Sequence, residues 1–452
     1  MKHLSYRTIQ TKAHQKSDEE LFVEEVAISQ IASAVGTPFY CYSKKSLVEN
    51  FQSFVDAFEA QKITDYKICY AIKANFNLSL VKILSELGSG IDAVSAGEIF
   101  RALKAGVNPK KIVFAGVGKT RDEMKFALEN GVEEFSVESI AEMFLLNEVA
   151  CSLNKKAKFS LRVNPNVDAK THDKISTGRK GDKFGVDIEL AKEVYAKAAR
   201  LSGLEIYGIS MHIGSQITTI EPFEKAFEKM RQLFLELKSE GHKISALDFG
   251  GGIGIFYKNE NTLLLSDYAK LIKKITHDLD VKITIAPGRA MIGNAGLLAT
   301  KIIFLKETSV KDFVIIDAAM NDLMRPGLYG SYHEVLQNVR KDRFSQVSFE
   351  VSDKVFDKFS DKVSTKVSEK VFAKVFDLAG PVCESTDILA QSRILIEPKP
   401  EDLLVFCSAG AYGSSMSNEY NCRPMIPEIL VDGKNFSVIR RRPSFEEMLN
   451  LY

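Results

Sequence analysis

The sequence predicts an α/β protein: a (β/α)₈ TIM-type barrel joined to a second, mostly β domain at the C-terminal side. Three observations support this fold class. The chain has 452 residues, which is more than one ordinary domain uses. From residue 66 to 289, short apolar runs alternate with amphipathic helical stretches. After residue 290, short apolar and β-branched runs follow one another instead.

The apolar runs of the first region predict the barrel strands. There are eight of them, and eight strands interleaved with helices form a closed barrel more naturally than an open sheet. Each run ends in Gly, Ser, Asn or a charged residue, as buried strands do at their ends. The predicted strands are Ile68–Ala71, Ile91–Ser95, Ile112–Ala115, Glu134–Val137, Phe159–Val163, Ile206–His212, Ala246–Phe249 and Ile283–Ala286.

The region from residue 290 to 452 reads as a separate, mostly β domain. Its runs are short and rich in β-branched residues, which is typical of strands. They are Lys301–Leu305, Phe313–Asp317, Leu403–Cys407, Glu428–Val431 and Phe436–Ile439.

Composition and charge exclude several classes of function. Lys plus Arg is 60 and Asp plus Glu is 59, so nothing indicates nucleic acid or an anionic membrane as a partner. No apolar run is long enough to span a bilayer, and Met1–Glu25 lacks the apolar core of a signal peptide. The six cysteines form no Cys-x-x-Cys pair, so we expect reduced thiols, a cytoplasmic protein and no metal site.

One lysine stands at the end of the first barrel strand. Lys73 follows the apolar run Ile68–Ile72, and functional groups of such barrels collect at the C-terminal strand ends. In a crowded surrounding the amine would lose hydration and its pKa would fall, so it could attack a carbonyl and form a Schiff base. The competing interpretation is a lysine that reaches out to solvent.

Other strand ends carry groups suited to an anionic, flat cofactor. A ring at His212 could stack on it, the Gly250–Gly252 amides could approach a phosphate, and Pro287-Gly288-Arg289 would present a guanidinium. Taken singly, these could be a core histidine, a flexible loop and a surface salt bridge. The residues at strand ends are Lys73, Ser95, Asn164, His212, Ser215, Gly250, Gly251, Gly252, Gly288 and Arg289.

These motifs, in this order, resemble one family. Tyr-Ala-Ile-Lys-Ala-Asn (70–75), His-Ile-Gly-Ser-Gln (212–216) and the triple glycine resemble motifs of the diaminopimelate decarboxylases, pyridoxal-phosphate enzymes of the alanine-racemase-like fold. The resemblance extends from about Thr37 to Leu430. Its C-terminal motifs are Asp322–Pro326 with Tyr329, Cys383–Ser385 with Asp387, Ala411–Gly413 and Ser417–Pro424.

The resemblance implies a reaction and residue roles. The enzyme would be a carboxy-lyase that converts meso-2,6-diaminopimelate to L-lysine and CO₂, the last step of lysine biosynthesis, with pyridoxal 5'-phosphate as cofactor. Lys73 would carry the cofactor, and Cys383 would protonate the α-carbon after CO₂ leaves. The cofactor would also contact His212, Ser215, Gly250, Gly251, Gly252, Gly288, Arg289 and Tyr412, and the substrate would contact Arg289, Arg325, Tyr329, Glu384 and Tyr412.

The resemblance also implies how the chain is organised. Residues 1–38 would join residues 290–452 in the β-rich domain, and the barrel would span residues 39–289. The protein would be a homodimer with shared active sites, in which Cys383 and Glu384 serve the partner's Lys73.

One departure from the family pattern leaves alternatives open. The family normally has Glu before Pro-Gly-Arg, facing the cofactor's ring nitrogen, whereas this chain has Ala286. The alternatives are a non-catalytic cofactor-binding homologue, or a decarboxylase of another basic amino acid such as ornithine or arginine. Arg325 and Tyr329, together with Cys383–Ser385, argue against the second alternative, because a second carboxylate needs cationic partners.

The second departure is an insertion at about residues 340–376. Lysine recurs at every fourth position from Lys354 to Lys374, each time followed by Val or Phe. This spacing fits a helix or a strand, and in a helix the apolar line would drift by about 40° per repeat. We therefore predict an accessory segment of low complexity rather than a catalytic element.

Overall fold

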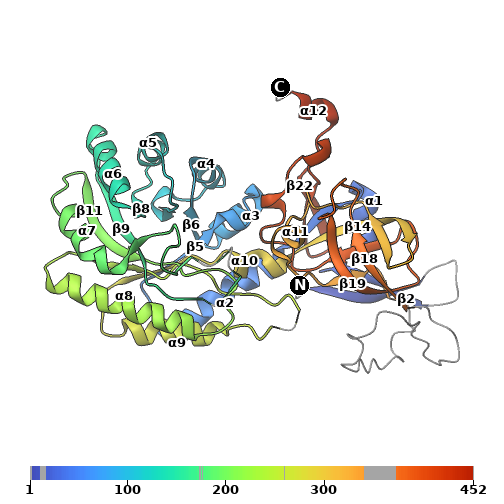
Figure 1. Cartoon of the computed structure of the whole chain (residues 1–452), viewed down its shortest axis with the longest axis horizontal. Coiled ribbons are helices and arrows are strands. Elements are labelled where there is room, and N and C mark those ends of the chain that lie inside the picture. The colour runs from blue at the N-terminus through green and yellow to red at the C-terminus, as the bar shows by residue number, and fades with distance from the viewer. Residues whose placement is uncertain are drawn as a thin grey trace. The chain divides into compact units, whose positions relative to one another are not determined.

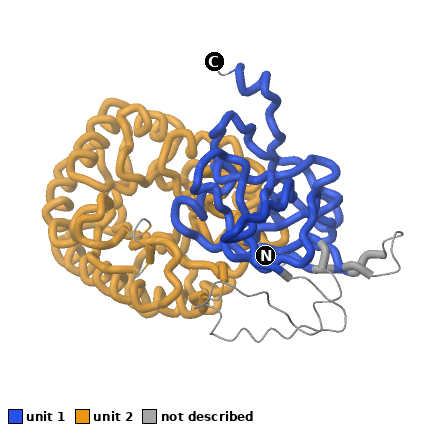
Figure 2. Tube along the Cα trace, turned by 45° about the vertical axis from the view of Figure 1, so that its right-hand side comes forward, with its two compact units in different colours: residues 1–43, 297–407, 417–452 blue, residues 44–296, 408–416 orange. Residues whose placement is uncertain are grey.

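The computed structural model describes residues 3–10, 17–169, 171–172, 175, 177–258, 260–340 and 373–450. The chain forms two compact units (Figure 2). Unit 1 comprises Met1–Ser43, Leu297–Cys407 and Ser417–Tyr452, and unit 2 comprises Lys44–Gly296 and Ser408–Met416. In the described part of the chain, no helix combines the length and apolarity needed to cross a membrane.

Unit 2 is the predicted barrel. Its eight strands are all parallel, each pairs with the next along the chain, and the last strand pairs with the first, which closes the barrel. All eight predicted strands are confirmed. They are β5 (Tyr66–Ala71), β6 (Gly90–Ala93), β7 (Ile112–Phe114), β8 (Glu134–Val137), β9 (Ala157–Asn164), β11 (Leu204–Ser210), β12 (Ala246–Asp248) and β13 (Lys282–Ile285).

Helices surround the barrel strands (Figure 1). On α8 the buried residues recur every three or four positions, which forms the apolar stripe of an amphipathic helix. Phe223 and Phe227 of this stripe pack edge-on against Tyr268, and Phe227 also packs against Phe249. The helices are α2 (Lys44–Ala60), α3 (Leu78–Glu86), α4 (Ala96–Lys104), α5 (Arg121–Glu129), α6 (Ile140–Ser152), α7 (Ala191–Ala198), α8 (Glu221–Ser239) and α9 (Leu265–Thr276).

At the C-terminal ends of the barrel strands, short helical elements follow β5 and β13, whereas longer connections follow β9, β11 and β12. Because the strands are parallel, these elements meet at one end of the barrel. The residues after β5, β11, β12 and β13 therefore lie around the same opening. The elements are the 3₁₀ turns η1 (Ile72–Ala74) and η5 (Gly293–Ala295) and helix α10 (Arg289–Ile292), while β10 (Val186–Asp187) extends the sheet beside β9.

Unit 1 is mostly β, as predicted. Its larger sheet has the order β19-β18-β15-β14-β4-β21-β22, with β20 pairing β14 and β16. A smaller sheet contains β1, β2, β3 and β17. The elements are β1 (Leu4–Gln10), β2 (Ser17–Val23), β3 (Val26–Ala27), α1 (Ile28–Val35), β4 (Phe39–Ser43), β14 (Gly296–Glu307), β15 (Asp312–Ile316), α11 (Arg325–Tyr329), β16 (Val335–Gln337), β17 (Val339–Arg340), β18 (Ala373–Ala379), β19 (Ile388–Ile396), β20 (Leu403–Phe406), β21 (Glu428–Asp432), β22 (Asn435–Arg440) and α12 (Phe445–Leu449).

Most of the predicted insertion, residues 341–372, lies outside the described residues. Its last residues, from Ala373 on, belong to β18, which pairs antiparallel with β19, so the accessory segment ends before Ala373. Val375 is 53% exposed and Phe376 only 5%, and every residue from Phe376 to Ala379 is buried, so the strand enters the core after Val375. Lys374 forms ion pairs with Asp312 at 2.6 Å and Glu307 at 2.9 Å.

Candidate active site

Lys73 lies in the 3₁₀ turn that directly follows β5. Its neighbours Ile72 and Ala74 are buried, so the turn is anchored from both sides, whereas the Lys73 side chain is exposed. The backbone N–H of Asn75 donates to Ile72 at 3.0 Å, and the Tyr70 hydroxyl donates to the Asn75 carbonyl at 2.9 Å. The predicted position at a strand end is confirmed, but the expected crowding around the amine is wrong.

His212 follows β11 and presents a neutral ring. Its Nδ1 accepts the backbone N–H of Gly251 at 3.2 Å, so a neutral imidazole carries its proton on Nε2. Burial lowers the pKa of His212 well below its ordinary value, and the charges of Lys73 and Arg162 lower it further. The ring is therefore held in one tautomer and one orientation, as stacking on a flat partner requires.

The triple glycine is dictated by close packing between strand ends. A Cβ on Gly250, whose φ is +64°, would lie 2.2 Å from the Met211 carbonyl oxygen, and one on Gly251 would lie 2.1 Å from that of Ala286. The N–H of Gly250 donates to Asp248 at 2.8 Å, and that of Gly251 donates to His212. These two amides orient side chains of the site, so the expectation that they face an anion is wrong for both.

Arg289 is a buried guanidinium at the start of α10, held by three side chains of unit 2. Its Nε and Nη2 donate to the Ser215 hydroxyl at 3.3 and 3.0 Å, and its Nη1 donates to the Tyr257 hydroxyl at 2.7 Å. The guanidinium carbon lies 4.9 Å from the centre of the Tyr412 ring, which is cation–π distance. The structure thus brings three predicted residues together and adds Tyr257, which sequence reasoning missed.

Tyr412 lies in the segment Ser408–Met416, which belongs to unit 2 although it follows Lys73 by more than 330 residues. Its N–H donates to the Ala74 carbonyl at 2.8 Å, and the Asn75 side chain donates to the Gly410 carbonyl at 3.2 Å. Tyr412 has a φ of +55°, a left-handed conformation that is costly for a non-glycine residue. Strain of this kind persists where the surroundings enforce it, here beside the Lys73 turn.

Two carboxyl groups whose pKa values respond to the charge of Lys73, those of Asp92 and Glu98, were not predicted from the sequence. Asp92, in β6, has a raised pKa because it is buried, and the charge of Lys73 opposes that rise. Burial raises the pKa of Glu98 to about 7, while its hydrogen bond from the Val94 N–H, at 2.7 Å, opposes the rise. A charged residue inside the predicted strand Ile91–Ser95 was the signal that could have revealed Asp92, which lies one residue before the observed end of β6.

In unit 1, the predicted substrate residue Arg325 is buried and held by a histidine. Its Nη1 donates to His333 Nε2 at 2.8 Å, because arginine has no acceptor. His333 Nδ1 therefore carries the proton and donates to the Cys407 carbonyl at 2.8 Å. His333 is fully buried and fixes the arginine, a role that no local spacing indicated. Tyr329, at the end of the same short helix α11, is half-buried.

Cys383 and Glu384 lie on an exposed loop of unit 1 whose base is anchored by Asp387. The Asp387 carboxylate accepts the N–H of Val382 at 2.7 Å and that of Met320 at 2.6 Å, and burial raises its pKa. Glu384 accepts a hydrogen bond from the Thr386 hydroxyl at 2.5 Å. The thiol and the carboxylate are thus presented on the surface of their unit.

Comparison with known proteins identifies the family. Residues 27–293 match the model of the pyridoxal-dependent decarboxylase family, pyridoxal binding domain. The chain is 44% identical to a diaminopimelate decarboxylase of Aquifex aeolicus, over 95% of this chain and 94% of that protein. A diaminopimelate decarboxylase of Vibrio cholerae is 42% identical, with 97% of each chain covered. This chain belongs to the diaminopimelate decarboxylases.

Solved structures of diaminopimelate decarboxylases agree with this family over nearly the whole chain. The enzyme of Helicobacter pylori in complex with L-lysine has a TM-score of 0.83 and 38% identity, and covers 94% of this chain and 98% of its own. That of M. jannaschii in complex with L-lysine has a TM-score of 0.84 and 34% identity, with 95% of each chain covered. The expected fold, family and cofactor class are therefore confirmed.

Proposed function

We propose that this chain decarboxylates meso-2,6-diaminopimelate to L-lysine and CO₂ with pyridoxal 5'-phosphate as cofactor. One observation carries the proposal within this family. The end of the barrel combines an exposed primary amine, a neutral histidine ring locked in one tautomer, and a buried arginine paired with Ser215 and Tyr412. An amine, a flat surface and a cationic phosphate site are what this cofactor needs.

The residues present fit the cofactor. Lys73 would hold it covalently, His212 would stack on its ring, and Arg289 with Ser215 would bind its phosphate. Tyr412 would contact the phosphate and the substrate, and from the glycine turns we assign Gly252 and Gly288. Bound there, pyridoxal phosphate withdraws electrons from the α-carbon of an amino acid, and the protein supplies orientation and electrostatics.

The remaining predicted residues would handle the substrate. Arg325, fixed by His333, and Tyr329 would bind the distal carboxylate that distinguishes diaminopimelate from lysine. Glu384 would bind the distal ammonium. The Cys383 thiol would donate its proton to the α-carbon once CO₂ has left. The distal carboxylate would stay in the product.

We further propose a homodimer with shared active sites, working in the cytoplasm. Cys383 and Glu384 sit on an exposed loop, which suits groups that act on a second chain. In the dimer they would complete the site around the partner's Lys73. All six cysteines are free, as reducing surroundings require.

Ala286 favours a second candidate, a homologue that binds the cofactor without turning substrate over. Ala286 directly follows β13 and is buried, and its N–H donates to the Gly250 carbonyl at 2.7 Å. Its side chain offers no carboxylate to the cofactor's ring nitrogen. If this candidate holds, the wild-type protein would bind pyridoxal phosphate and release no lysine, and Ala286→Glu would raise turnover.

The test is direct. Purified protein is incubated with pyridoxal phosphate and meso-diaminopimelate, and lysine and CO₂ are measured. Equal release of both products supports the proposal. L-ornithine and L-arginine serve as controls, and faster release of CO₂ from either of them would refute the assigned substrate. Cofactor binding without any product would establish the second candidate.

A further inference from the structure

A pocket lies at the opposite end of the barrel from the candidate active site. It has a volume of about 680 Å³ and is lined mainly by residues in the first half of β5, β7, β8, β9, β11 and β13 or just before these strands. Phe51 and Val55 of α2, and Leu87 and Gly88 before β6, complete the lining. Lys67 is near the start of β5, and Ala71, which leads into the Lys73 turn, ends it. About 13 Å of strand separates the two. The pocket is therefore a feature distinct from the cofactor site.

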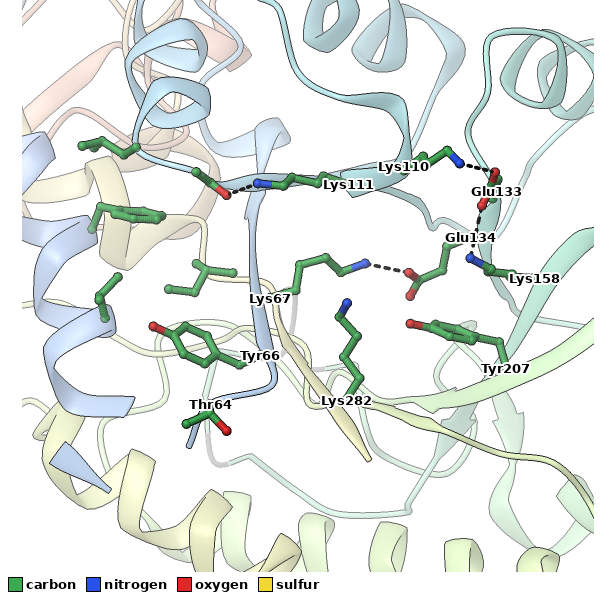
Figure 3. A pocket seen from close by; sticks show the side chains of 15 residues that line it. Thr64, Tyr66, Lys67, Lys110, Lys111, Glu133, Glu134, Lys158, Tyr207 and Lys282 are labelled. Carbon is green, nitrogen blue, oxygen red and sulfur yellow. Dashed lines mark hydrogen bonds and ion pairs between the residues drawn. The ribbon is translucent and has the colours of Figure 1, made fainter. Parts of the chain in front are cut away.

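The lining of this pocket is strongly cationic. It holds five lysines and two glutamates and no arginine, so the difference between positive and negative groups is three charges. In Figure 3 these side chains line one hollow. The lysines are Lys67, Lys110, Lys111, Lys158 and Lys282, and the glutamates are Glu133 and Glu134.

Both glutamates of the pocket form ion pairs with its lysines. Lys67 pairs with Glu134 at 2.6 Å, and both side chains are about nine-tenths buried. Glu133 is shared between Lys158 at 3.1 Å and Lys110 at 3.6 Å. The two glutamates therefore balance only part of the positive charge.

Lys282 pairs with neither of these two glutamates. Across the described residues, its Nζ has neither an ion pair nor a hydrogen bond, although the side chain is half-buried. Figure 3 shows its ammonium end pointing toward the same part of the pocket as the Lys67–Glu134 pair and the Tyr207 hydroxyl. An unpaired ammonium in a recess already rich in lysine costs free energy through lost hydration and like-charge repulsion. An anion bound beside it would offset that cost.

We propose that this pocket binds a phosphate group, either free phosphate or the phosphate of a small metabolite, at the N-terminal end of the barrel. Ammonium groups act as compact point charges that surround a tetrahedral polyanion, whereas flat carboxylates favour the fork of arginine. Lys282 supplies the main contact, with the Tyr207 hydroxyl beside it. The Lys111 ammonium donates to the Gly88 carbonyl at 3.1 Å and is turned away from Lys282. The competing interpretation is that the lysines only stabilise the barrel, as residues at this end often do.

The test uses the cofactor-loaded enzyme, so that the phosphate site near Arg289 is already filled. Sodium phosphate is titrated calorimetrically at pH 8 in a phosphate-free buffer, with ionic strength held constant by sodium chloride. We expect one saturable site per chain. Lys282→Met should weaken binding about tenfold or more, the scale of one charge-assisted hydrogen bond. Lys225→Met, at an exposed position of α8 outside the pocket, should leave it unchanged.

Thermal stability separates binding from a structural role. Without phosphate, Lys282→Met should melt at or above the wild-type temperature, because an unpaired charge is removed. A lower melting temperature would identify Lys282 as a structural residue and refute the proposal. Absence of saturable binding, or equal weakening in Lys282→Met and Lys225→Met, would refute it as well. Tyr207→Phe gives a second variant that keeps the ring, and we expect it to bind more weakly.

The two sources of the phosphate are distinguished by a parallel titration with glucose 6-phosphate. Tighter binding of the ester than of inorganic phosphate would assign the pocket to a metabolite. Equal or weaker binding of the ester would assign it to free phosphate. Both results support the proposed site, and neither depends on the decarboxylase activity.

Discussion

The two groups of candidate residues are held in contrasting ways. In unit 2, Arg289 is buried and has three aromatic or hydroxyl partners, and His212 is locked by a backbone amide. In unit 1, Cys383 and Glu384 stand exposed on a loop that is anchored at its base by Asp387. The difference shows that the residues proposed to bind the cofactor are already held in place within unit 2, whereas the proposed proton donor Cys383 stands on an exposed loop of unit 1.

The largest effect should follow from removing the amine. Lys73→Ala should lower turnover by about 10³-fold or more, because Lys73 is the proposed covalent anchor of the cofactor. Borohydride should trap a cofactor adduct in the wild type and none in the variant, as measured by peptide mapping. Lys82→Ala, an exposed lysine of α3, is the matched control and should keep both activity and adduct. An adduct on a different lysine would contradict the assignment.

Subunit complementation tests whether the exposed loop acts on a second chain. Lys73→Ala and Cys383→Ala should each be nearly inactive. After random subunit exchange, half of the dimers are mixed, and each mixed dimer has one intact site, so activity should recover to about 25% of wild type if sites are independent. The measurement is lysine release after exchange, with dimer mixing followed by a fluorescent label. Complete mixing without recovery would place both residues in one chain's site.

Loosening the loop should harm turnover but not cofactor binding. Asp387→Ala leaves the N–H groups of Val382 and Met320 without their acceptor, at a cost of about 1–3 kcal/mol each. We expect kcat to fall about tenfold or more, with an unchanged cofactor dissociation constant. Val310→Ala, at an exposed position of unit 1 outside the loop and the family motifs, is the control. A simultaneous loss of cofactor affinity would show that the loop around Cys383 also affects the residues proposed to bind the cofactor.

A change beside Arg289 should have the opposite effect. It should weaken cofactor binding and leave turnover unchanged when the cofactor is saturating. Tyr257→Phe removes one hydrogen bond to the Arg289 guanidinium, which should weaken cofactor affinity by about tenfold. With excess pyridoxal phosphate, kcat should stay near wild type. Tyr66→Phe, at the other end of the barrel, controls for loss of a hydroxyl. A fall in kcat with unchanged cofactor affinity would show that Tyr257 acts on the reacting groups rather than on cofactor binding.

The smallest effect should come from the accessory segment. Its four-residue repeat offers no lasting apolar stripe, so replacing residues 342–371 with a short Gly/Ser linker should change the melting temperature by no more than about 2 °C. Scanning calorimetry and light scattering would measure stability and oligomeric state. The replacement stops before β18, because Ala373–Ala379 pairs with β19 and belongs to the sheet. Loss of the folded dimer would show that the segment contributes to the core or the interface.

The sequence by itself determined the barrel and the end at which its chemistry gathers. Buried strands and amphipathic helices differ in hydrophobic period, and the C-terminal ends of parallel strands necessarily share one edge. Lys73, His212 and Arg289 were therefore predictable as neighbours of a common opening before any coordinates were known. Their chemical identities, an amine, an imidazole and a guanidinium, then pointed to an anionic carbonyl cofactor.

Only the tertiary structure decided what holds these groups in place. Tyr257 fixes Arg289, His333 fixes Arg325, and Gly410 passes close to the Lys73 turn, across separations that no local spacing records. The Gly250 and Gly251 amides face Asp248 and His212 rather than an anion, because the packing of strand ends fixes their direction. Hydrophobic period is a local property of the chain, whereas hydrogen-bond partners depend on which distant segments the fold brings within about 3 Å.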